Sequence, residues 1–363
     1  MKHIVFIIDN LSGGGAERIV LTLASALNAT GHQAIIITLS ENIKHEIPDN
    51  VVIYNVPQPK SNIGNIGKYH RHAKVLNRKL QHLHQQIPIN LVVSNLPRTD
   101  RITQYIKGFN LYFCIHNTYS CEYLSNRTGL SRWLKYQKIK KVYRNKNIIA
   151  VSKGVEHDVI DTLQLPVKKT VQIYNPFSID EIRGLADSRS KNDYGAFIIH
   201  VGRITRQKRH DRLLRIYKNS SAFPDVKLVL IGSGSESDKH QLKSLIKEQQ
   251  LESHVIMHGF EKNPFPLIKK AKALLLTSDF EGFGNVLVES LICGTPVIST
   301  NCPSGPSEIL IGSLSRFLIE TDNEDDYAIA ITEALRNPPV ITPKYYERFA
   351  AMNIAREYLV LAD

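Results

Sequence analysis

The sequence predicts an α/β protein made of two Rossmann-like, doubly wound domains in tandem. Short uninterrupted apolar runs suit buried parallel strands, and segments with helical spacing separate them. The length points the same way, because 363 residues exceed what one hydrophobic core usually serves. We place the first domain at residues 1–175 and the second at 176–344. We expect a C-terminal helix at about 345–363 to pack back on the first domain.

The first forty residues predict a strand, a helix and a second strand. Ile4–Ile8 is a continuous apolar run, and Ala34–Leu39 is another. Between them, apolar residues from Ile19 to Leu27 recur at helical spacing. Two parallel strands joined in this way should cross over right-handed. Similar runs extend the predicted sheet at Leu91–Val93, Leu111–Ile115 and Ile148–Val151.

The second domain is predicted to begin after a break in the pattern. From Asn175 through Ser190 the chain is polar and turn-like, and a second α/β series follows with helical segments such as His240–Gln250. Two such domains are expected to enclose a cleft at the carboxyl ends of their strands. The predicted strands are Phe197–Val201, Val226–Ile231, Val255–His258, Ala273–Leu276 and Val297–Thr300.

Composition narrows the function classes. A net charge of +12 and a pI near 9.4 predict attraction to an anionic partner: nucleic acid, a phosphorylated substrate or an acidic membrane surface. The four cysteines include no C-x-x-C pair, so neither a zinc site nor a disulfide framework is indicated. The apolar run at the N-terminus is too short for a signal peptide, and no run is long enough to span a bilayer. We therefore expect a cytoplasmic protein.

Basic residues are concentrated in one stretch, Arg127–Lys146, which contains no acid. Apolar residues including Trp133 and Leu134 are interleaved with the basic ones, as in a basic amphipathic helix. Two interpretations stay open: a solvated helix whose apolar side packs on the core, and a helix that lies on an anionic membrane surface.

Residues 281–300 read EGFGNVLVESLICGTPVIST and place two carboxylates around a glycine-rich turn. Gly284 permits close approach of a ligand, and the helix N-terminus at Asn285 and Val286 favours an anion. Glu289, one turn into the helix, can point back to that ligand, whereas Glu281 can reach another part of it. The pattern suits a nucleoside diphosphate sugar, although two glutamates at this spacing also occur in unrelated helices.

Two further motifs follow predicted strands. HVGRITRQK offers Arg203 and Lys208 to a diphosphate, or is an ordinary basic surface turn. SGGGAE forms a glycine-lined turn after the first strand. It is not the dinucleotide fingerprint, because Arg18 occupies the place of the third glycine.

Taken together, these motifs resemble the retaining glycosyltransferases of the GT-B fold, specifically glycosyltransferase family 4. The matching segments run in the family's order and spacing over nearly the whole chain. They are SGGGAE, VGRITRQK, IGSGSE, HGF, EGFGNVLVE and GTPVISTNCPSGPSEIL.

The resemblance implies roles for the second domain. Arg203 and Lys208 would bind the donor diphosphate and stabilise the leaving group. Glu289 would hold ribose hydroxyls, and Glu281 would lie beside the transferred sugar. Three residues would present main chain to the sugar and phosphates: Gly284, Asn285 and Val286.

Other residues are assigned on the same basis. Gly259 and Phe260 would lie beside the base. In the first domain, His116 matches the family histidine that contacts the donor sugar next to the reacting centre. Gly14 and Gly15 would line the junction between acceptor and donor.

The resemblance also implies substrates and a location. The expected donor is a UDP-linked hexose or N-acetylhexosamine, and the expected acceptor is a saccharide or lipid-linked glycan of bacterial lipopolysaccharide, capsule or other surface polysaccharide. No cofactor is expected. No two aspartates stand two residues apart, so Arg203 and Lys208 are predicted to replace a metal. The enzyme would be peripheral on the cytoplasmic face of the inner membrane, held through Arg127–Lys146.

Three alternatives are set against this interpretation. A nicotinamide-dependent oxidoreductase shares the fold class but needs the missing third glycine. A non-catalytic sugar-binding protein of two α/β domains is usually exported. Nucleic-acid binding rests on the pI alone and lacks a recognised module, so no nucleic-acid partner is predicted.

Overall fold

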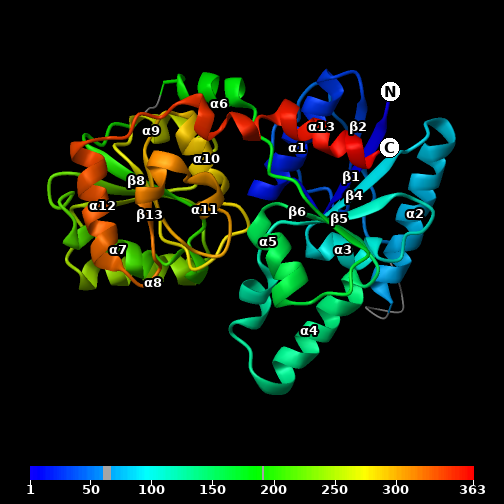
Figure 1. The fold of residues 1–363 in the computed structure, drawn as a ribbon, viewed down its shortest axis with the longest axis horizontal. Coiled ribbons are helices and arrows are strands. Elements are labelled where there is room, and N and C mark those ends of the chain that lie inside the picture. The colour runs from blue at the N-terminus through cyan, green and yellow to red at the C-terminus, as the bar shows by residue number, and fades with distance from the viewer. Residues whose placement is uncertain (60–66, 190–191) are drawn as a thin grey trace. The chain divides into compact units, whose positions relative to one another are not determined.

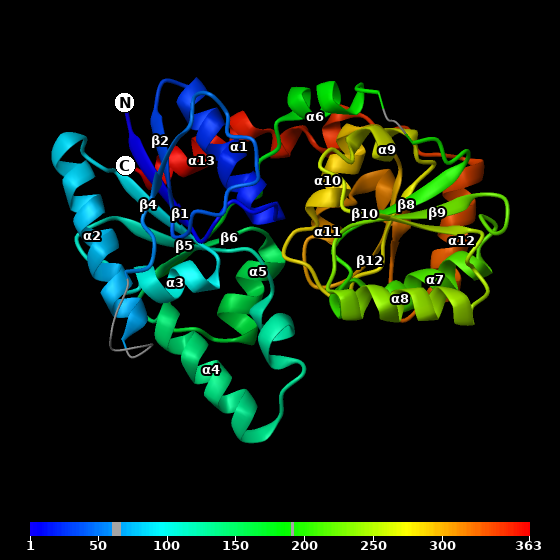
Figure 2. The ribbon, with the colours of Figure 1, turned by 180° about the vertical axis from the view of Figure 1, so that it is seen from behind.

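The computed structural model describes residues 1–59, 67–189 and 192–363. Within these ranges the chain forms two compact units, Met1–Phe177 with Phe349–Asp363 (unit 1) and Ser178–Arg348 (unit 2). Each unit is a parallel sheet with helices packed on both faces (Figures 1 and 2). The predicted class, two Rossmann-like doubly wound units, is confirmed.

The described part of unit 1 holds a seven-stranded parallel sheet in the order β3-β2-β1-β4-β5-β6-β7. The winding reverses between β1 and β4, where Ile4 of β1 pairs with Ala34 on one side and Leu91 on the other. Every residue of β1, β4 and β5 is buried. The burial of their apolar runs is what the sequence predicts, and Ser94 and Asn95 at the end of β4 are buried as well. The strands are β1 (His3–Ile8), β2 (Gln33–Thr38), β3 (Val52–Asn55), β4 (Leu91–Asn95), β5 (Leu111–Ile115), β6 (Asn147–Ala150) and β7 (Lys169–Gln172).

The helices of unit 1 include one from the far end of the chain. α13 packs against α1, which also contacts β2. No helix among the described residues combines the length and the apolar character needed to cross a membrane. The helices are α1 (Gly15–Ala29), α2 (Lys68–Gln86), α3 (Pro97–Thr103), α4 (Gly129–Tyr143), α5 (Lys153–His157) and α13 (Ala351–Leu361).

Unit 2 repeats the same topology over its described residues. Its parallel sheet has the order β10-β9-β8-β11-β12-β13, with the reversal between β8 and β11. Helices lie on both faces of this sheet (Figure 2). Its strands are β8 (Phe197–Val201), β9 (Lys227–Ile231), β10 (Val255–Gly259), β11 (Leu274–Leu276), β12 (Val297–Thr300) and β13 (Leu318–Ile319). Its helices are α6 (Ile179–Ala186), α7 (His210–Asn219), α8 (Glu236–Glu248), α9 (Phe265–Lys270), α10 (Asn285–Ile292), α11 (Pro306–Ile309) and α12 (Glu324–Arg336).

The structure corrects the sequence prediction at the periphery. The stretch from Asn175 is not turn-like throughout, because α6 lies within it and buries Ile182 and Ala186, one helical turn apart. Ser190, at the end of that stretch, lies outside the described residues. Strands β3, β7 and β13 were not predicted, because these short, partly exposed strands lack a continuous apolar run. The helix predicted from His240 begins earlier, after the N-cap Ser235.

Candidate active site

The residues predicted to hold the donor diphosphate and sugar lie in unit 2, on loops that follow the carboxyl ends of strands. β8 leads into the turn that carries Arg203 and Lys208, and β11 leads into the loop that carries Glu281. These two strands are neighbours at the reversal of strand order. Open α/β sheets bind ligands at this point. The sheet therefore brings these predicted residues to the edge where a ligand is expected.

Lys208 and Glu281 form an ion pair. Lys208 Nζ donates to Glu281 Oε1 at 2.5 Å, and the two side chains are only 14% and 11% exposed. Ser278 Oγ donates to the same carboxylate oxygen at 2.6 Å. Since both charges are largely removed from water, each depends strongly on the other. The pair places a fixed cation and a fixed anion side by side, which suits a ligand with both an anionic group and hydroxyls.

A network of charges joins the loops that carry this pair. Arg209 makes two hydrogen bonds to Asp211, both at 2.9 Å, and a third at 2.9 Å to Asp279. Burial by itself raises the pKa of Asp211, but Arg209 outweighs it and lowers that pKa to about 2. Asp211 is therefore ionised at neutral pH. The charge-assisted bonds of the network fix the spacing between the Lys208 loop and the Glu281 loop.

The loop after β12 supports Glu281 from another side. Pro303 O accepts a hydrogen bond from Glu281 N at 2.8 Å, and Ser304 N donates to Glu281 O at 3.1 Å. Gly305 has a φ of 98°, and a Cβ there would stand 2.0 Å from Phe283 O. Only glycine allows this approach. Three strand-to-helix loops thus converge on Glu281.

Helix α10 begins immediately after this loop. Gly284 is its N-cap with a left-handed φ of 89°. The first N–H groups of a helix have no acceptor within the helix and carry partial positive charge. Asn285, Val286 and Glu289 are each partly exposed. The N-terminus of α10 is therefore positioned to meet an anionic ligand.

A cavity of about 210 Å³ lies at the carboxyl ends of β8, β9 and β10. Glycines, aliphatic side chains and two lysines of α8 line it, and Gly259 is among its walls. Phe260, next to Gly259, is 64% exposed and offers an uncovered aromatic face. At Gly232 a Cβ would stand 1.8 Å from Gly202 O, so glycine is required where the β8 and β9 loops meet. The size and lining suit the flat, partly apolar end of a nucleotide.

Two histidines pack near Lys208. Burial lowers the pKa of His210 to about 4 and holds the pKa of His200 well below its usual range, and Lys208 adds to both effects. Their rings meet edge to face at 4.9 Å between centroids. Both are neutral at pH 7, so the positive charge on these loops comes from lysine and arginine.

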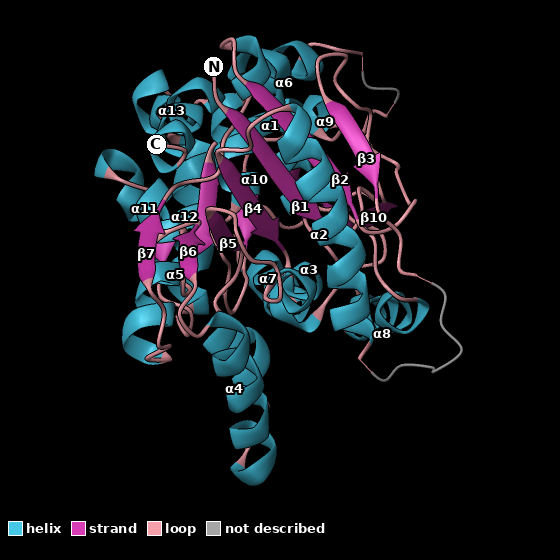
Figure 3. Ribbon diagram, turned by 90° about the vertical axis from the view of Figure 1, so that its right-hand side faces the viewer, coloured by secondary structure: helices cyan, strands magenta, loops and turns pink. Residues whose placement is uncertain are grey.

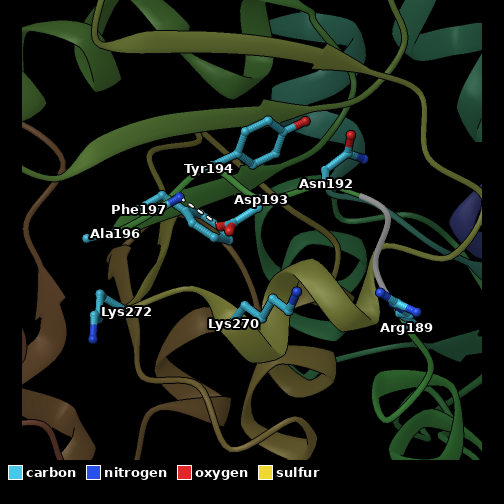
Figure 4. Close-up of a pocket in the computed structure, with 9 residues that line it drawn as sticks. Arg189, Asn192, Asp193, Tyr194, Ala196, Phe197, Lys270 and Lys272 are labelled. Atoms are coloured by element: carbon cyan, nitrogen blue, oxygen red, sulfur yellow. Dashed lines mark hydrogen bonds between the residues drawn. The ribbon is translucent and has the colours of Figure 1, made fainter.

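A larger cavity of about 650 Å³ lies elsewhere in unit 2 (Figure 4). It is formed by residues that precede β8 and by the end of α9, and Lys270 and Lys272 border it. Asp193 accepts a hydrogen bond from the main chain of Gly195 at 3.1 Å, as Figure 4 shows. None of the residues predicted to bind the donor lines this cavity.

In unit 1 the glycine turn is closed by a carboxylate. Gly13 N and Gly14 N donate to Glu17 Oε2 at 2.6 and 2.5 Å. Burial alone would raise the pKa of the Glu17 carboxyl. His45 and these two N–H groups lower that pKa by more than burial raises it, so the pKa lies below its usual value. Gly15 is the first residue of α1. A charged Glu17 therefore fixes the turn, which is a role that the sequence analysis did not assign.

His116 follows β5 and contacts the residue that ends the neighbouring strand. Its Nε2 lies 3.0 Å from Asn95 Oδ1. An amide oxygen only accepts, so Nε2 carries the proton and Nδ1 is left as an acceptor. Desolvation lowers the pKa of His116 to about 4. This histidine is neutral at pH 7.

Comparison with known proteins assigns the family. A family model described as Glycosyltransferase Family 4 matches residues 13–181, and one described as Glycosyl transferases group 1 matches residues 185–353. The chain is a family 4 glycosyltransferase.

Relatives of this glycosyltransferase share substantial identity. It is 29% identical over 331 residues to the Campylobacter jejuni N-acetylgalactosamine-N,N'-diacetylbacillosaminyl-diphospho-undecaprenol 4-alpha-N-acetylgalactosaminyltransferase, covering 90% of this chain and 88% of that protein. It is 31% identical over 185 residues to a lipopolysaccharide 1,6-galactosyltransferase of Salmonella typhimurium, covering 49% of each chain.

Solved structures show the fold of the glycosyltransferase. A variant of Staphylococcus aureus TarM, solved with fondaparinux, alpha-GlcNAc-glycerol and UDP, matches with a TM-score of 0.76 at 15% identity and covers 100% of both chains. Anabaena HepE, solved with UDP and glucose, matches with a TM-score of 0.75 at 19% identity and covers 99% of both chains. The fold is GT-B, as the resemblance implied.

The structure brings together only part of the predicted set. Lys208 and Glu281 are in direct contact, whereas Arg203 is exposed beyond the end of β8. Sequence reasoning missed Ser278 and Arg209, which hold these residues in place. Ser278 stands three residues before Glu281, just ahead of the motif EGFGNVLVE, and this position was the signal that could have pointed to it. In the described residues no three or more His, Cys, Asp or Glu side chains gather as metal ligands would.

Proposed function

We propose that this glycosyltransferase moves a hexose or N-acetylhexosamine from a UDP-linked donor to a saccharide or lipid-linked acceptor, with retention of configuration and without a metal. The observation that carries the proposal is the buried Lys208–Glu281 pair at the strand-order reversal of unit 2. In this pair Lys208 would offer its ammonium to the phosphates, and Glu281 beside it would offer its carboxylate to the sugar.

The second unit would stabilise the leaving diphosphate. Breaking the bond between sugar and diphosphate adds negative charge to the phosphate oxygens and positive character to the anomeric carbon. Lys208 and the N-terminus of α10 would be fixed sources of positive potential for those oxygens, and the exposed Arg203 would add to them. Preorganised electrostatics of this kind often supplies most of the catalysis. With these groups in place, the enzyme would not need a metal held by a D-x-D motif. The sequence contains no such motif.

The carboxylates would position the donor. Glu281, held by Ser278, would lie at the transferred sugar, and Glu289 would accept hydrogen bonds from ribose hydroxyls. The main chain of Gly284, Asn285 and Val286 would meet the sugar and phosphates. Gly259 and the exposed Phe260 would border the base, beside the 210 Å³ cavity.

Unit 1 would serve the acceptor and the reacting sugar. Neutral His116 would contact the donor sugar through a hydrogen bond and not through charge. Gly14 and Gly15 would line the path of the acceptor. In the transfer, the acceptor oxygen bonds to the anomeric carbon on the face that the diphosphate leaves. The acceptor proton passes to a phosphate oxygen, so that UDP is released and configuration is retained.

The names of two relatives support the proposed acceptor. The Campylobacter relative is named for an undecaprenol-diphosphate-linked substrate, and the Salmonella relative for lipopolysaccharide. We place this enzyme in bacterial surface-glycan synthesis, peripheral on the cytoplasmic face of the inner membrane. The basic stretch Arg127–Lys146 would hold it to anionic lipid, because each basic residue near such a surface contributes about 1 kcal/mol.

A thermal-shift panel tests the proposed donor. UDP-sugars should raise the melting temperature, whereas GDP-sugars, NADH and oligonucleotides should leave it unchanged. Stabilisation by NADH alone would favour the oxidoreductase alternative. A donor that binds should then be hydrolysed slowly without acceptor. Binding of free sugars without any turnover of nucleotide sugars would support a non-catalytic protein instead.

A further inference from the structure

Three apolar side chains in the first half of α4 are exposed to solvent. Leu130 is 71% exposed, Trp133 is 55% exposed and Leu134 is 46% exposed. Their spacing of three and four residues puts them on one face of the helix. We refer to these three side chains as the apolar tip. Single exposed hydrophobic residues are ordinary on protein surfaces. Three on one helical face form an apolar patch of the kind that marks an interaction site.

The rest of α4 explains how the apolar tip is presented. The second half of the helix buries Ile139 and Tyr143 in unit 1. Tyr143 OH donates to Asp100 Oδ2 at 2.7 Å, which fixes this end to α3. Figure 3 shows the first half of α4 extending beyond the other elements of unit 1. The helix is thus anchored at one end and projects at the other.

The opposite face of the projecting half is occupied. Arg132 NH1 donates to Leu124 O at 2.7 Å, and Lys135 Nζ lies 3.8 Å from the centroid of the Tyr123 ring. These contacts hold α4 in one orientation about its axis. Leu130 and Trp133 are therefore kept facing outward, away from the segment that supports the helix.

The charges around the apolar tip select its occupant. Arg127, Lys138 and Lys141 are exposed, and no acid occurs between residues 127 and 146. Basic residues beside exposed Trp and Leu are the pattern of helices that lie in the interface of an anionic bilayer. Tryptophan in particular favours the boundary between head groups and acyl chains.

We propose that the apolar tip of α4 inserts into the acyl boundary of an anionic bilayer while Arg127, Lys138 and Lys141 bind its head groups. This deepens the membrane location given under the proposed function and rests on it. The location alone requires only electrostatic attraction, which high salt abolishes. Insertion adds an apolar contribution to the binding free energy, and this contribution persists in high salt.

The chain carries its own probe, because Trp133 is its single tryptophan. The full-length enzyme is mixed with vesicles of phosphatidylglycerol and phosphatidylcholine, or of phosphatidylcholine alone. With the anionic vesicles, Trp133 emission should shift to the blue and be quenched by lipids brominated on the acyl chain. Phosphatidylcholine alone should produce neither effect.

Two variants separate insertion from attraction. Leu130→Ser with Leu134→Ser keeps Trp133 and all the charges, and should weaken binding by about tenfold or more, most visibly in high salt. Lys138→Glu with Lys141→Glu should abolish binding at low salt. The matched control is Ile329→Ser, which removes a 64% exposed apolar side chain from unit 2 and should leave vesicle binding unchanged.

Each other outcome overturns a stated part. If the enzyme floats with anionic vesicles but Trp133 emission is neither shifted nor quenched, insertion is wrong and attraction alone remains. If it does not float while donor hydrolysis persists, the membrane location and the insertion both fail and the proposed transfer stands. A blue shift that grows with protein concentration without lipid would make a second copy of the chain the occupant.

Discussion

Replacing Lys208 with methionine tests whether the buried ion pair organises the site. Methionine keeps an unbranched side chain but leaves the Glu281 carboxylate, which is 11% exposed, without its ammonium partner at 2.5 Å. Removing one member of a largely buried pair costs about 3 kcal/mol, because the remaining charge stays poorly solvated. In a Glu281→Gln background no carboxylate is left behind, so the same replacement should cost about 1 kcal/mol or less.

The double-mutant cycle is measured by chemical denaturation followed with circular dichroism. We expect a coupling of at least about 1.5 kcal/mol between Lys208 and Glu281, from the difference between those two costs. The control is Lys270→Met, because Lys270 is exposed, and it should change stability by less than about 0.5 kcal/mol. Additivity of the two substitutions within about 0.5 kcal/mol would refute the pair as an element of the free enzyme.

Three further predictions concern the metal, a buried acid and a glycine. Turnover should persist in excess EDTA, since the chain lacks D-x-D; complete loss that manganese or magnesium restores would show that the phosphate site was misread. Burial raises the pKa of Asp100 from 3.8 to about 7. Between these two pH values the native state keeps a proton that the unfolded chain releases. Stability should therefore fall as the pH rises through this range, by up to about 1.4 kcal/mol per pH unit, and Asp100→Asn should remove this component; an unchanged pH dependence in the variant would contradict the assignment. Gly232→Ala should cost about 2 kcal/mol or more of stability, because its Cβ would meet Gly202 O; a variant as stable as the wild type would argue against the close approach of the two loops.

The core of the fold was predictable because its strands are continuous apolar runs. β1, β5 and β8 are buried on both faces, so hydrophobicity alone marks them. β3 and β7 are partly exposed and mix polar with apolar residues, so no pattern separates them from loops. Helix α6 was hidden for a related reason, since only two of its eight residues are buried.

The candidate site is predicted from the sequence as a set of residues, whereas the contacts between those residues are known only from the fold. The glycines and carboxylates stand in short motifs, which sequence reasoning detects. The pairing of Lys208 with Glu281 joins positions 73 residues apart. It arises because β8 and β11 become neighbours when the sheet forms. Similarly, the sequence marked α4 as basic and apolar, but only the fold leaves Trp133 exposed while it buries Tyr143.

The most direct test of the proposed transfer compares three rates of UDP release, those of the wild type, Glu281→Gln and Lys208→Ala. The substrate is a UDP-sugar that the wild type turns over. The account predicts that each variant is slower by at least about tenfold, or about 1.4 kcal/mol of barrier, while circular dichroism stays native. Glu281 and Lys208 meet at the strand-order reversal of unit 2, so both losses should fall on turnover. Near-wild-type rates in both variants would contradict the assignment of the active site.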